Sequence, residues 1–449
     1  MSRRPVRRFL PDPLDRRIAA LAVPALGTLA VEPLYVATDT AIVGHLGTEP
    51  LAGLAVASQI LVLLASLANF LAYGTTQRLA HLRGAGRQRD ASHAGTQALW
   101  LAAGLGTLAA VVIAVAARPL ASLIGAQGPA LEHAVTYLRI SSLALPAVLL
   151  TIACHGILRA ELRLGGLLVV VVVANLVNLV VELVFVNVLH LGIAGSAWST
   201  VIAQVGSVLA YLALVRRTVA PALGWPRWSV MRPLLDVGAV LVLRVGALMA
   251  TFTIATAIAA RIDPPTLAAH QIIGSLFILF ALCLDALAVP TQTLVAEAIG
   301  ADDTPLAARV AKRSLRLSIG AGLVLGMALA ASAPWVGRLF SNDHAVVSRA
   351  SGGVLVLAVL LVPGAAAFAV DGILIGAGQF RALSHMMLVV LVVFIGCATV
   401  PILVPASGVI GIWGALAVWM LGRAFLGVRW CQRYLWVSPG PSDPIDHFM

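Results

Sequence analysis

Asp39 is a carboxylic acid inside an almost wholly apolar stretch that runs from Leu21 to Val43. A helix of this length is about long enough to cross the hydrocarbon core of a bilayer. A charged side chain there costs roughly 2.5 to 3.5 kcal/mol on insertion scales, so such acids usually face a cavity and have a function. Pro33 removes one backbone donor six residues earlier and gives the helix a place to bend. We therefore predict that Asp39 takes up and releases a proton and that helix 1 changes around Pro33.

A second polar group lies in the Val- and Leu-rich run near residue 176. Asn175, Asn178 and Glu182 are spaced i, i+3 and i+7, so they share one face of a helix. Three polar groups in one stripe indicate a lined cavity, and Glu182 is a second acid that could act with Asp39. Two alternatives stay open: the asparagines could only join helices by hydrogen bonds, and Asp39 could be a structural acid paired with Arg244.

The C-terminal half has its own acids in apolar surroundings. These residues could bind a cation or substrate, or could only anchor helix ends. Tyr35, beside the predicted bend, could line the same cavity as Asp39. The predicted cavity and substrate-binding residues are Tyr35, Asn175, Thr200, Gln271, Asp285, Gln292 and Asp371, where Gln271 and Gln292 are possible neighbours of the two acids.

Composition excludes a soluble globular domain. Of the 449 residues, 60% are hydrophobic and 11% charged, and the mean hydropathy is +0.98, whereas soluble domains carry about 25% charged residues. The four cysteines, Cys154, Cys283, Cys397 and Cys431, form no CxxC or Cys/His pattern, so we predict neither a disulfide framework nor a metal site. The chain is predicted to be an all-α polytopic membrane protein.

Counting apolar runs predicts twelve transmembrane helices. Their approximate centres are residues 32, 66, 105, 146, 176, 204, 247, 281, 320, 361, 392 and 419. The formal charge of +11 comes from basic residues in alternate connections and near both termini, which favours a membrane protein with both termini cytoplasmic over a nucleic-acid partner. Nearly all basic residues are arginine, and Ala, Gly and Pro are abundant. This usage hints at a high-GC bacterial genome, so we expect the bacterial cytoplasmic (inner) membrane.

Short sequence matches at a nearly constant offset predict an internal repeat. Gly156-Ile157-Leu158 recurs as Gly372-Ile373-Leu374, a spacing of 216, and Thr76-Gln77 recurs as Thr291-Gln292, a spacing of 215. We expect an N-terminal lobe of helices 1–6 (residues 1–215), a cytoplasmic linker (216–235) and a C-terminal lobe of helices 7–12 (236–449). Two halves with an even number of crossings are related by a pseudo-two-fold axis along the membrane normal, with a central cavity between them.

The motif from Val36 to Gly47, VATDTAIVGHLG, resembles the first-helix motif of the multidrug and toxic compound extrusion (MATE) transporters, in their DinF-like branch. Further matches occur in family order at Gly195–Ala203, Leu267–Ile272, Asp285–Ala288 and Asp371–Gly378. The resemblance spans nearly the whole chain.

The resemblance implies a secondary active transporter, not an enzyme, that exports organic, often cationic or amphipathic compounds by alternating access. It implies that Asp39 is the proton-linked site, that Asn178 and Glu182 accompany it, and that Thr200 is the helix 6 hydroxyl. The family usually has Asp at the position of Glu182. We predict proton coupling, with sodium as the alternative, no cofactor, a monomer in the lipid bilayer and small organic substrates.

Other functions are less well supported by the residues. A lipid-linked oligosaccharide flippase should present several basic side chains in its cavity, and the arginines here lie mostly in the connections. An intramembrane protease would need a paired catalytic constellation, and neither HExxH nor GxSxG occurs. A channel would not need a repeat around a membrane acid.

Overall fold

The chain folds almost entirely into long helices. The computed structural model describes residues 12–219 and 224–435, and these ranges contain no strand. The elements are α1 (Pro13–Gly44), α2 (Thr48–Ala68), α3 (Phe70–Gly84), α4 (Gln88–Ile124), α5 (Gly128–Ser142), α6 (Leu145–Ala160), α7 (Leu164–Leu183), η1 (Val184–Val188), α8 (Gly192–Val219), α9 (Trp228–Ile262), α10 (Pro264–Gly300), α11 (Thr304–Phe340), α12 (His344–Gly376), α13 (Phe380–Leu403), η2 (Pro405–Ser407) and α14 (Gly408–Tyr434).

The helices account for the twelve predicted crossings. Within the described residues, eleven spans are long and apolar enough to cross a bilayer, and the pair α5 and α6 makes a twelfth if it is counted as one span bent by 55°. Pro146 lies in the first turn of α6, where its missing N–H leaves no intrahelical bond unmade, which explains why a new helix starts there. The all-α, twelve-helix prediction is confirmed.

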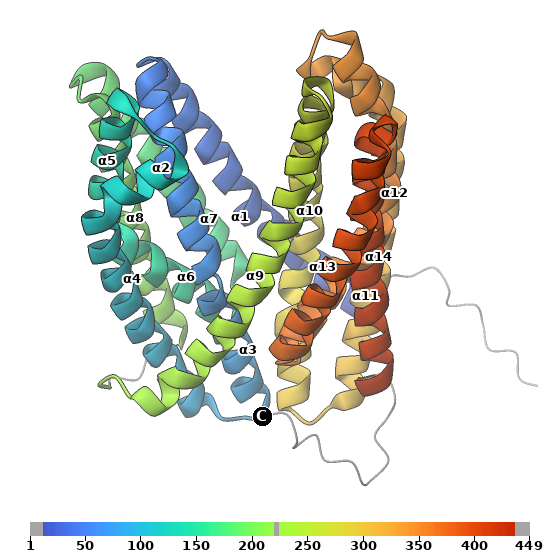
Figure 1. Ribbon diagram of the computed structural model, residues 1–449. Coiled ribbons are helices and arrows are strands. Elements are labelled where there is room, and N and C mark those ends of the chain that lie inside the picture. Colours follow the sequence, from blue (N-terminus) through green and yellow to red (C-terminus); the bar gives the residue numbers. More distant parts are fainter. Residues whose placement is uncertain (1–11, 220–223, 436–449) are drawn as a thin grey trace, which may run out of the picture.

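The helices form two lobes that diverge toward one end of the molecule (Figure 1). We call α1–α8 with η1 the N-lobe and α9–α14 with η2 the C-lobe. Helix α8 continues to Val219 and α9 starts at Trp228, so helices extend into both ends of the range predicted as linker, and residues 220–223 lie outside the described residues. Gln97 of α4 holds the start of α9, because its amide accepts from the Arg227 N–H (2.6 Å) and donates to the Trp225 carbonyl (3.0 Å).

The first helix of each lobe packs its N-terminal part against the other lobe. Ile18 of α1 is fully buried with Leu294 of α10 and Val310 of α11. Leu234 of α9 is buried with Leu71 of α3 and other N-lobe residues. Ile18 and Leu234 are 216 residues apart, the spacing of the sequence repeat. The crossing is therefore reciprocal, as a pseudo-two-fold relation requires.

A reciprocal contact between α3 and α10 supports the same symmetry. A Cβ added at Gly84 would lie 2.0 Å from the carbonyl oxygen of Glu297, and one added at Gly300 would lie 2.0 Å from the carbonyl oxygen of His81. These two pairs also match at a spacing of 216. The helices approach so closely only because both positions lack a side chain.

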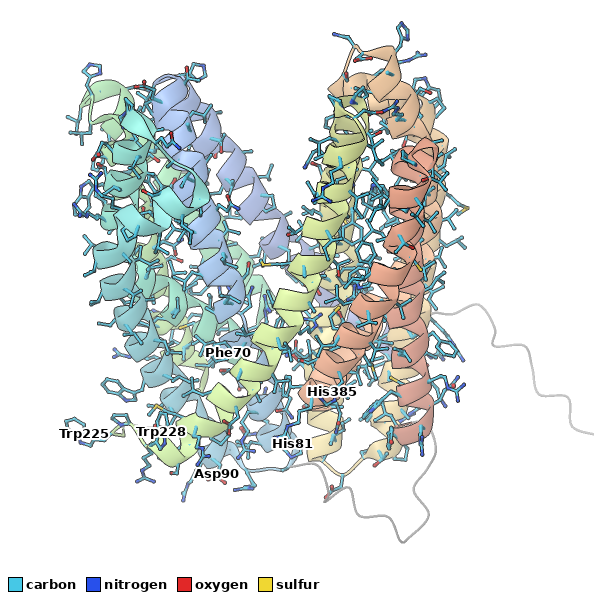
Figure 2. The ribbon with its side chains drawn as sticks, in the orientation of Figure 1. Phe70, His81, Asp90, Trp225, Trp228 and His385 are labelled. Carbon is cyan, nitrogen blue, oxygen red and sulfur yellow. The ribbon has the colours of Figure 1, made fainter. Side chains whose placement is uncertain are left out.

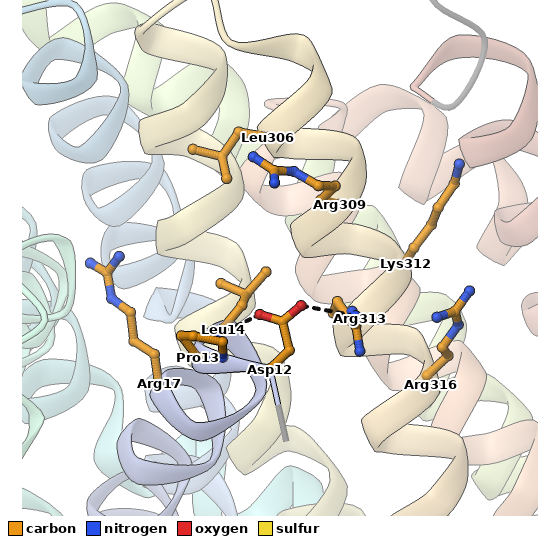
Figure 3. A pocket seen from close by; sticks show the side chains of 9 residues that line it. All are labelled: Asp12, Pro13, Leu14, Arg17, Leu306, Arg309, Lys312, Arg313 and Arg316. Carbon is orange, nitrogen blue, oxygen red and sulfur yellow. Dashed lines mark hydrogen bonds and ion pairs between the residues drawn. The ribbon is translucent and has the colours of Figure 1, made fainter. Parts of the chain in front are cut away.

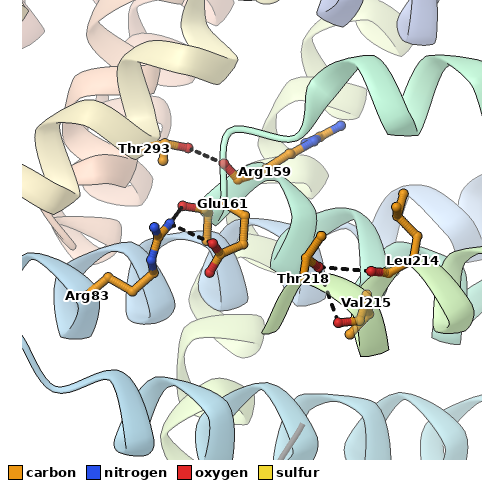
Figure 4. A network of polar contacts seen from close by, with 8 residues as sticks. Arg83, Arg159, Glu161, Leu214, Val215, Thr218 and Thr293 are labelled. Atoms are coloured by element: carbon orange, nitrogen blue, oxygen red, sulfur yellow. Dashed lines mark hydrogen bonds and ion pairs between the residues drawn. The ribbon is translucent and has the colours of Figure 1, made fainter. Parts of the chain in front are cut away.

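The α3–α10 contact lies at the end of the molecule that carries most of the basic connections, which we call the arginine-rich end. Polar contacts also join the lobes there. Thr293 of α10 donates to the carbonyl of Arg159 in α6 across the lobe interface (3.1 Å; Figure 4). Within the N-lobe, Arg83 of α3 supports the same end of α6, because it binds the Ala160 carbonyl (2.6 Å) and Glu161 (3.2 Å). Burial raises the pKa of the Glu161 carboxyl, and the charge of Arg83 opposes that shift.

Apolar contacts continue the interface toward the middle of the molecule. Phe70 of α3 packs against the C-lobe cluster that contains Leu241 and Leu374, and its ring lies where a side chain at Gly238 of α9 would be (Figure 2). The lobes therefore meet at the arginine-rich end and separate toward the opposite end.

Candidate functional site

Asp39 is buried between α1 and α8. Its side chain is 5% exposed, and Ser196 of α8 donates from Oγ to Asp39 Oδ1 at 2.5 Å. A hydroxyl that donates to a carboxylate oxygen at this distance makes a strong, charge-assisted hydrogen bond. Asp39 lies five residues before the C-terminal end of α1, and this end of the helix lies where the lobes are apart (Figure 1).

Glu182 of α7 joins this pair. Its side chain is 1% exposed and interacts with both Asp39 and Ser196. Within the described residues, Glu182 Oε1 and Asn178 Oδ1 are buried without a hydrogen-bond partner. The Asn178 amide reaches Ser199 Oγ only at 3.5 Å, which is a weak contact. The N-lobe thus holds two adjacent acids, and Glu182 and Asn178 each have one buried acceptor oxygen without a partner among the described residues.

An aromatic and hydroxyl layer adjoins the acids. Tyr35 of α1 hydrogen-bonds through its hydroxyl to Thr200 Oγ1 (2.8 Å), and Thr200 donates to the backbone carbonyl of Ser196 (3.2 Å). Tyr137 of α5 also interacts with Thr200 and Ser196. The layer connects α1, α5 and α8 around the acids.

Local backbone geometry brings α8 to α7 at this point. Directly after Glu182, α7 passes into the five-residue π-helix η1, a widened turn that often occurs at functional sites. Gly195 packs against Phe185 of η1, and a Cβ there would lie 3.1 Å from the Phe185 backbone. The close approach places Ser196, the next residue, against the acids.

No basic side chain is ion-paired with Asp39 or Glu182 among residues 12–219 and 224–435. The salt bridges there involve other acids, and Arg244, the alternative partner of Asp39, binds Asp371 instead (2.6 Å). The alternative of a permanent Asp39–Arg244 pair is therefore wrong.

Two further residues of the predicted N-lobe site, Asn175 and Pro33, do not contact the acids through hydrogen bonds. Asn175 donates to the Val171 carbonyl of its own helix (2.7 Å) and makes no hydrogen bond to the acids. Pro33 lies inside α1, which is one continuous helix from Pro13 to Gly44. The predicted change of α1 around Pro33 stays a prediction.

The C-lobe acid Asp371 is not isolated, contrary to expectation. Arg244 of α9 and Arg423 of α14 each donate from Nη2 to Asp371 Oδ2 at 2.6 Å. Arg423, one of the basic residues toward the C-terminus, is 6% exposed within α14 and lies over the rings of Trp419 and Phe368. A charge this deep in apolar surroundings requires a partner, and Asp371 supplies it.

The other predicted C-lobe residues lie in α10. Asp285 is half-buried, and its electrostatic neighbours are Asp371, Arg244, Arg423 and Arg159. Gln292 is buried and donates across the lobe interface to the Tyr73 carbonyl (3.1 Å). Gln271 is exposed.

Sequence reasoning missed Ser196, Tyr137 and the arginine pair. Ser196 precedes Thr200 by one helical turn, so the two share a face, and that spacing could have identified it. Arg423 follows an apolar run from Gly408 to Gly422, which marks it as a membrane arginine. Tyr137 lies on α5 and gave no local signal.

Comparison with known proteins agrees with this architecture. The family model described as MatE matches residues 24–184 and, a second time, residues 241–400, one match in each lobe. The chain belongs to the MatE family. Its fold and its class, a multidrug efflux transporter, are those that the motifs predicted.

Relatives of this MATE transporter occur in plants and bacteria. DETOXIFICATION 44, chloroplastic, from Arabidopsis thaliana is 29% identical over 96% of this chain and 86% of the relative. DNA damage-inducible protein F from Escherichia coli (strain K12) is 26% identical over 94% of this chain and 93% of the relative. A MATE crystal structure in the bent conformation has a TM-score of 0.88 at 21% identity, covering 94% of this chain and 96% of that one.

Other solved relatives have the same fold. An outward-facing MATE transporter of the MOP superfamily has a TM-score of 0.86 at 21% identity, covering 94% and 96% of the two chains. The family and its alternating-access states establish this chain as a multi-pass membrane transporter.

Proposed function

We propose that this MATE transporter is a proton-coupled antiporter in which Asp39 and Glu182 together hold the coupling proton. The observation that carries the proposal is the contact of two buried acids, through Ser196, with no basic partner in the described part of the chain. Two like charges about 4 Å apart repel by roughly 4 kcal/mol at an effective dielectric constant near 20. Such a pair therefore holds one proton between its two members.

Exchange of that proton is the step that drives transport. With the proton gone, the pair gains a negative charge that attracts cationic cargo. When a proton enters from the side of higher proton potential, it removes that charge, releases the cargo and changes α1 around Pro33. Each proton that crosses 100 mV supplies about 2.3 kcal/mol. This is enough for roughly a 50-fold solute gradient at full coupling, since 1.36 kcal/mol corresponds to a factor of ten.

Sodium is the competing coupling ion. Asn178 Oδ1 and Glu182 Oε1 are buried acceptors without partners, and oxygen ligands suit a hard cation. We favour the proton because the two acids already share a hydroxyl donor that occupies one Asp39 oxygen. The experiment below separates the two ions.

The test is transport of a panel of fluorescent dyes in proteoliposomes under separately imposed pH and sodium gradients. We expect a pH gradient alone to drive transport, and Asp39→Asn and Glu182→Gln to reduce it by roughly tenfold or more, the effect of about 1.4 kcal/mol. Asn175→Ala is the matched control, since Asn175 bonds only within its own helix, and it should retain wild-type transport. Full pH-driven transport by Asp39→Asn would refute the proposal. Transport driven by a sodium gradient and not by a pH gradient would mean that sodium is the coupling ion.

The cargo and the membrane orientation are part of the proposal. We propose small organic compounds, neutral or cationic, since the N-lobe site offers acids without basic partners. The arginine-rich end is taken to face the cytoplasm of a bacterium, which gives both termini a cytoplasmic location. The flippase alternative would need free basic groups for pyrophosphate, whereas Arg244 and Arg423 are bound to Asp371. We expect the protein to act as a monomer.

A further inference from the structure

A basic hollow lies at the arginine-rich end, between the start of α1 and the first turns of α11 (Figure 3). Its volume is about 450 Å³, within the ~300–1,000 Å³ of small-molecule sites. The lining residues are Asp12, Pro13, Leu14, Arg17, Leu306, Arg309, Lys312, Arg313 and Arg316. None of them takes part in the proton site.

The charge of the hollow is strongly positive. Five of the nine lining residues are basic and one is acidic. Arg313 is already neutralised by Asp12 (2.8 Å) and Asp15 (3.1 Å). Arg17, Arg309 and Arg316 are exposed and form no ion pair among the residues that the structure describes. The positive charges of Arg17, Arg309 and Arg316 therefore favour binding of an anion in the hollow.

The depth of the hollow in the membrane suits a lipid headgroup. Helix α11 has 37 residues and is about 55 Å long at 1.5 Å per residue, while the hydrocarbon core is about 30 Å thick. The excess of about 25 Å is enough for the first turns of α11 to extend into the headgroup layer, where Arg309, five residues from the start of the helix, can meet a lipid phosphate. The apolar residues Pro13, Leu14 and Leu306 line the hollow beside the basic residues, so it matches a phosphate with an attached glycerol and acyl chains.

The hollow is shared between the two lobes, because α1 belongs to the N-lobe and α11 to the C-lobe. It exists only while the arginine-rich end is closed, since α1 must lie against α11 to form it. A ligand that binds one state and not the other shifts the equilibrium toward the state it binds. We propose that this hollow binds the phosphate headgroup of an anionic phospholipid and thereby stabilises the state in which the arginine-rich end is closed.

Basic residues at this end also direct membrane insertion, and that role alone needs only their number. It does not need four basic side chains of α11 and one of α1 around a common hollow. Basic pockets between transmembrane helices are suited to anionic lipid headgroups. The two explanations differ in whether lipid binding depends on these particular arginines.

The first test is thermal unfolding of the full-length protein in detergent with added phosphatidylglycerol, phosphatidylcholine or inorganic phosphate. We expect phosphatidylglycerol alone to raise the unfolding temperature, and the double variant Arg309→Gln/Arg316→Gln to lose most of that increase. The matched control Arg429→Gln/Arg433→Gln removes the same charge from exposed positions at the same end and should respond like wild type. Equal responses of the two double variants, or equal effects of the two lipids, would overturn the proposal. If inorganic phosphate raised the unfolding temperature as much as phosphatidylglycerol does, the ligand of the hollow would be a free anion and not a lipid.

A second measurement keeps the proposal testable if the double variant does not fold. The single variants Arg309→Gln and Arg316→Gln should each weaken the phosphatidylglycerol response, and the lipid comparison on wild type stands by itself. The state preference is checked with spin labels at Arg89→Cys of α4 and Arg381→Cys of α13, with the native cysteines replaced. Phosphatidylglycerol should increase the population with the shorter distance, and an unchanged distance distribution would contradict the state preference.

Discussion

One carboxylate oxygen of Asp371 holds two guanidinium groups in the interior of the C-lobe. Both distances are 2.6 Å, and Asp371 and Arg423 are almost completely buried. Breaking a buried ion pair by removing one partner costs about 3–5 kcal/mol, because the remaining charge is left without compensation. Asp371 serves two arginines, so its loss leaves two such charges side by side.

We expect Asp371→Asn to destabilise the protein much more than Arg244→Gln. The first substitution leaves Arg244 and Arg423 to repel each other, whereas the second leaves Asp371 paired with Arg423. The measurement is the thermal unfolding temperature in detergent, with Asp285→Asn as the control, since Asp285 is half-buried and forms no salt bridge in the described residues. Similar losses for Asp371→Asn and Arg244→Gln would show that the triad does not act as an ion cluster.

At the residue scale, the sequence predicted groups but not their partners. Asp39 and Glu182 were predictable because an acid in an apolar helix is costly and therefore rarely accidental. The bond from Ser196 to Asp39 joins residues 157 positions apart, and no local pattern encodes such a pairing. The binding of Arg244 and Arg423 to Asp371 was not predicted for the same reason: only the packing of α9, α12 and α14 brings the two guanidinium groups to one oxygen.

At the scale of helices, α3 and α10 are held together by two glycines. The added Cβ at either Gly84 or Gly300 would lie 2.0 Å from a backbone oxygen, so the two helices would have to move apart. Inserting a methylene into a well-packed interface costs typically about 1–3 kcal/mol. A backbone oxygen cannot rotate away as a flexible side chain can.

We therefore expect Gly84→Ala and Gly300→Ala each to open the arginine-rich end. The measurement is the rate at which a water-soluble thiol reagent labels a cysteine introduced at that end, Arg89→Cys of α4, after the native cysteines have been replaced. Gly104→Ala is the control. Gly104 is exposed on α4, and an added Cβ there meets nothing within 4 Å. If the two interface variants label at the control rate, this contact does not keep that end closed.

The helices themselves were largely predictable, because runs of apolar residues long enough to cross a bilayer leave few alternatives. Their interruptions were not. The 55° bend between α5 and α6 and the π-helix after Glu182 depend on contacts with neighbouring helices. Helix α9 begins inside the range predicted as linker and contains Pro233, although a proline beyond the first turn removes a helical hydrogen bond, and Gln97 holds the start of this helix.

At the scale of the whole molecule, the repeat predicted two lobes. It did not predict that the first helix of each lobe packs its N-terminal part against the other lobe. The buried side of α1 around Ile18 belongs to the C-lobe, and the buried side of α9 around Leu234 belongs to the N-lobe. Each lobe therefore lacks part of its own packing without the other. Motion between the lobes must take place around this shared region at the arginine-rich end.

Expression of the transporter as two separate chains, 1–219 and 224–449, tests this dependence. We expect the co-expressed halves to copurify through a tag on one of them and to retain pH-driven transport. Neither half should be recovered folded when expressed alone, because Ile18 or Leu234 then has no packing partner. The control is the same pair of halves with Gly84→Leu, which should weaken copurification by separating α3 from α10. Recovery of either half alone with the stability of the full chain would mean that the lobes fold independently and that the packing of α1 and α9 against the opposite lobe contributes little to holding the lobes together.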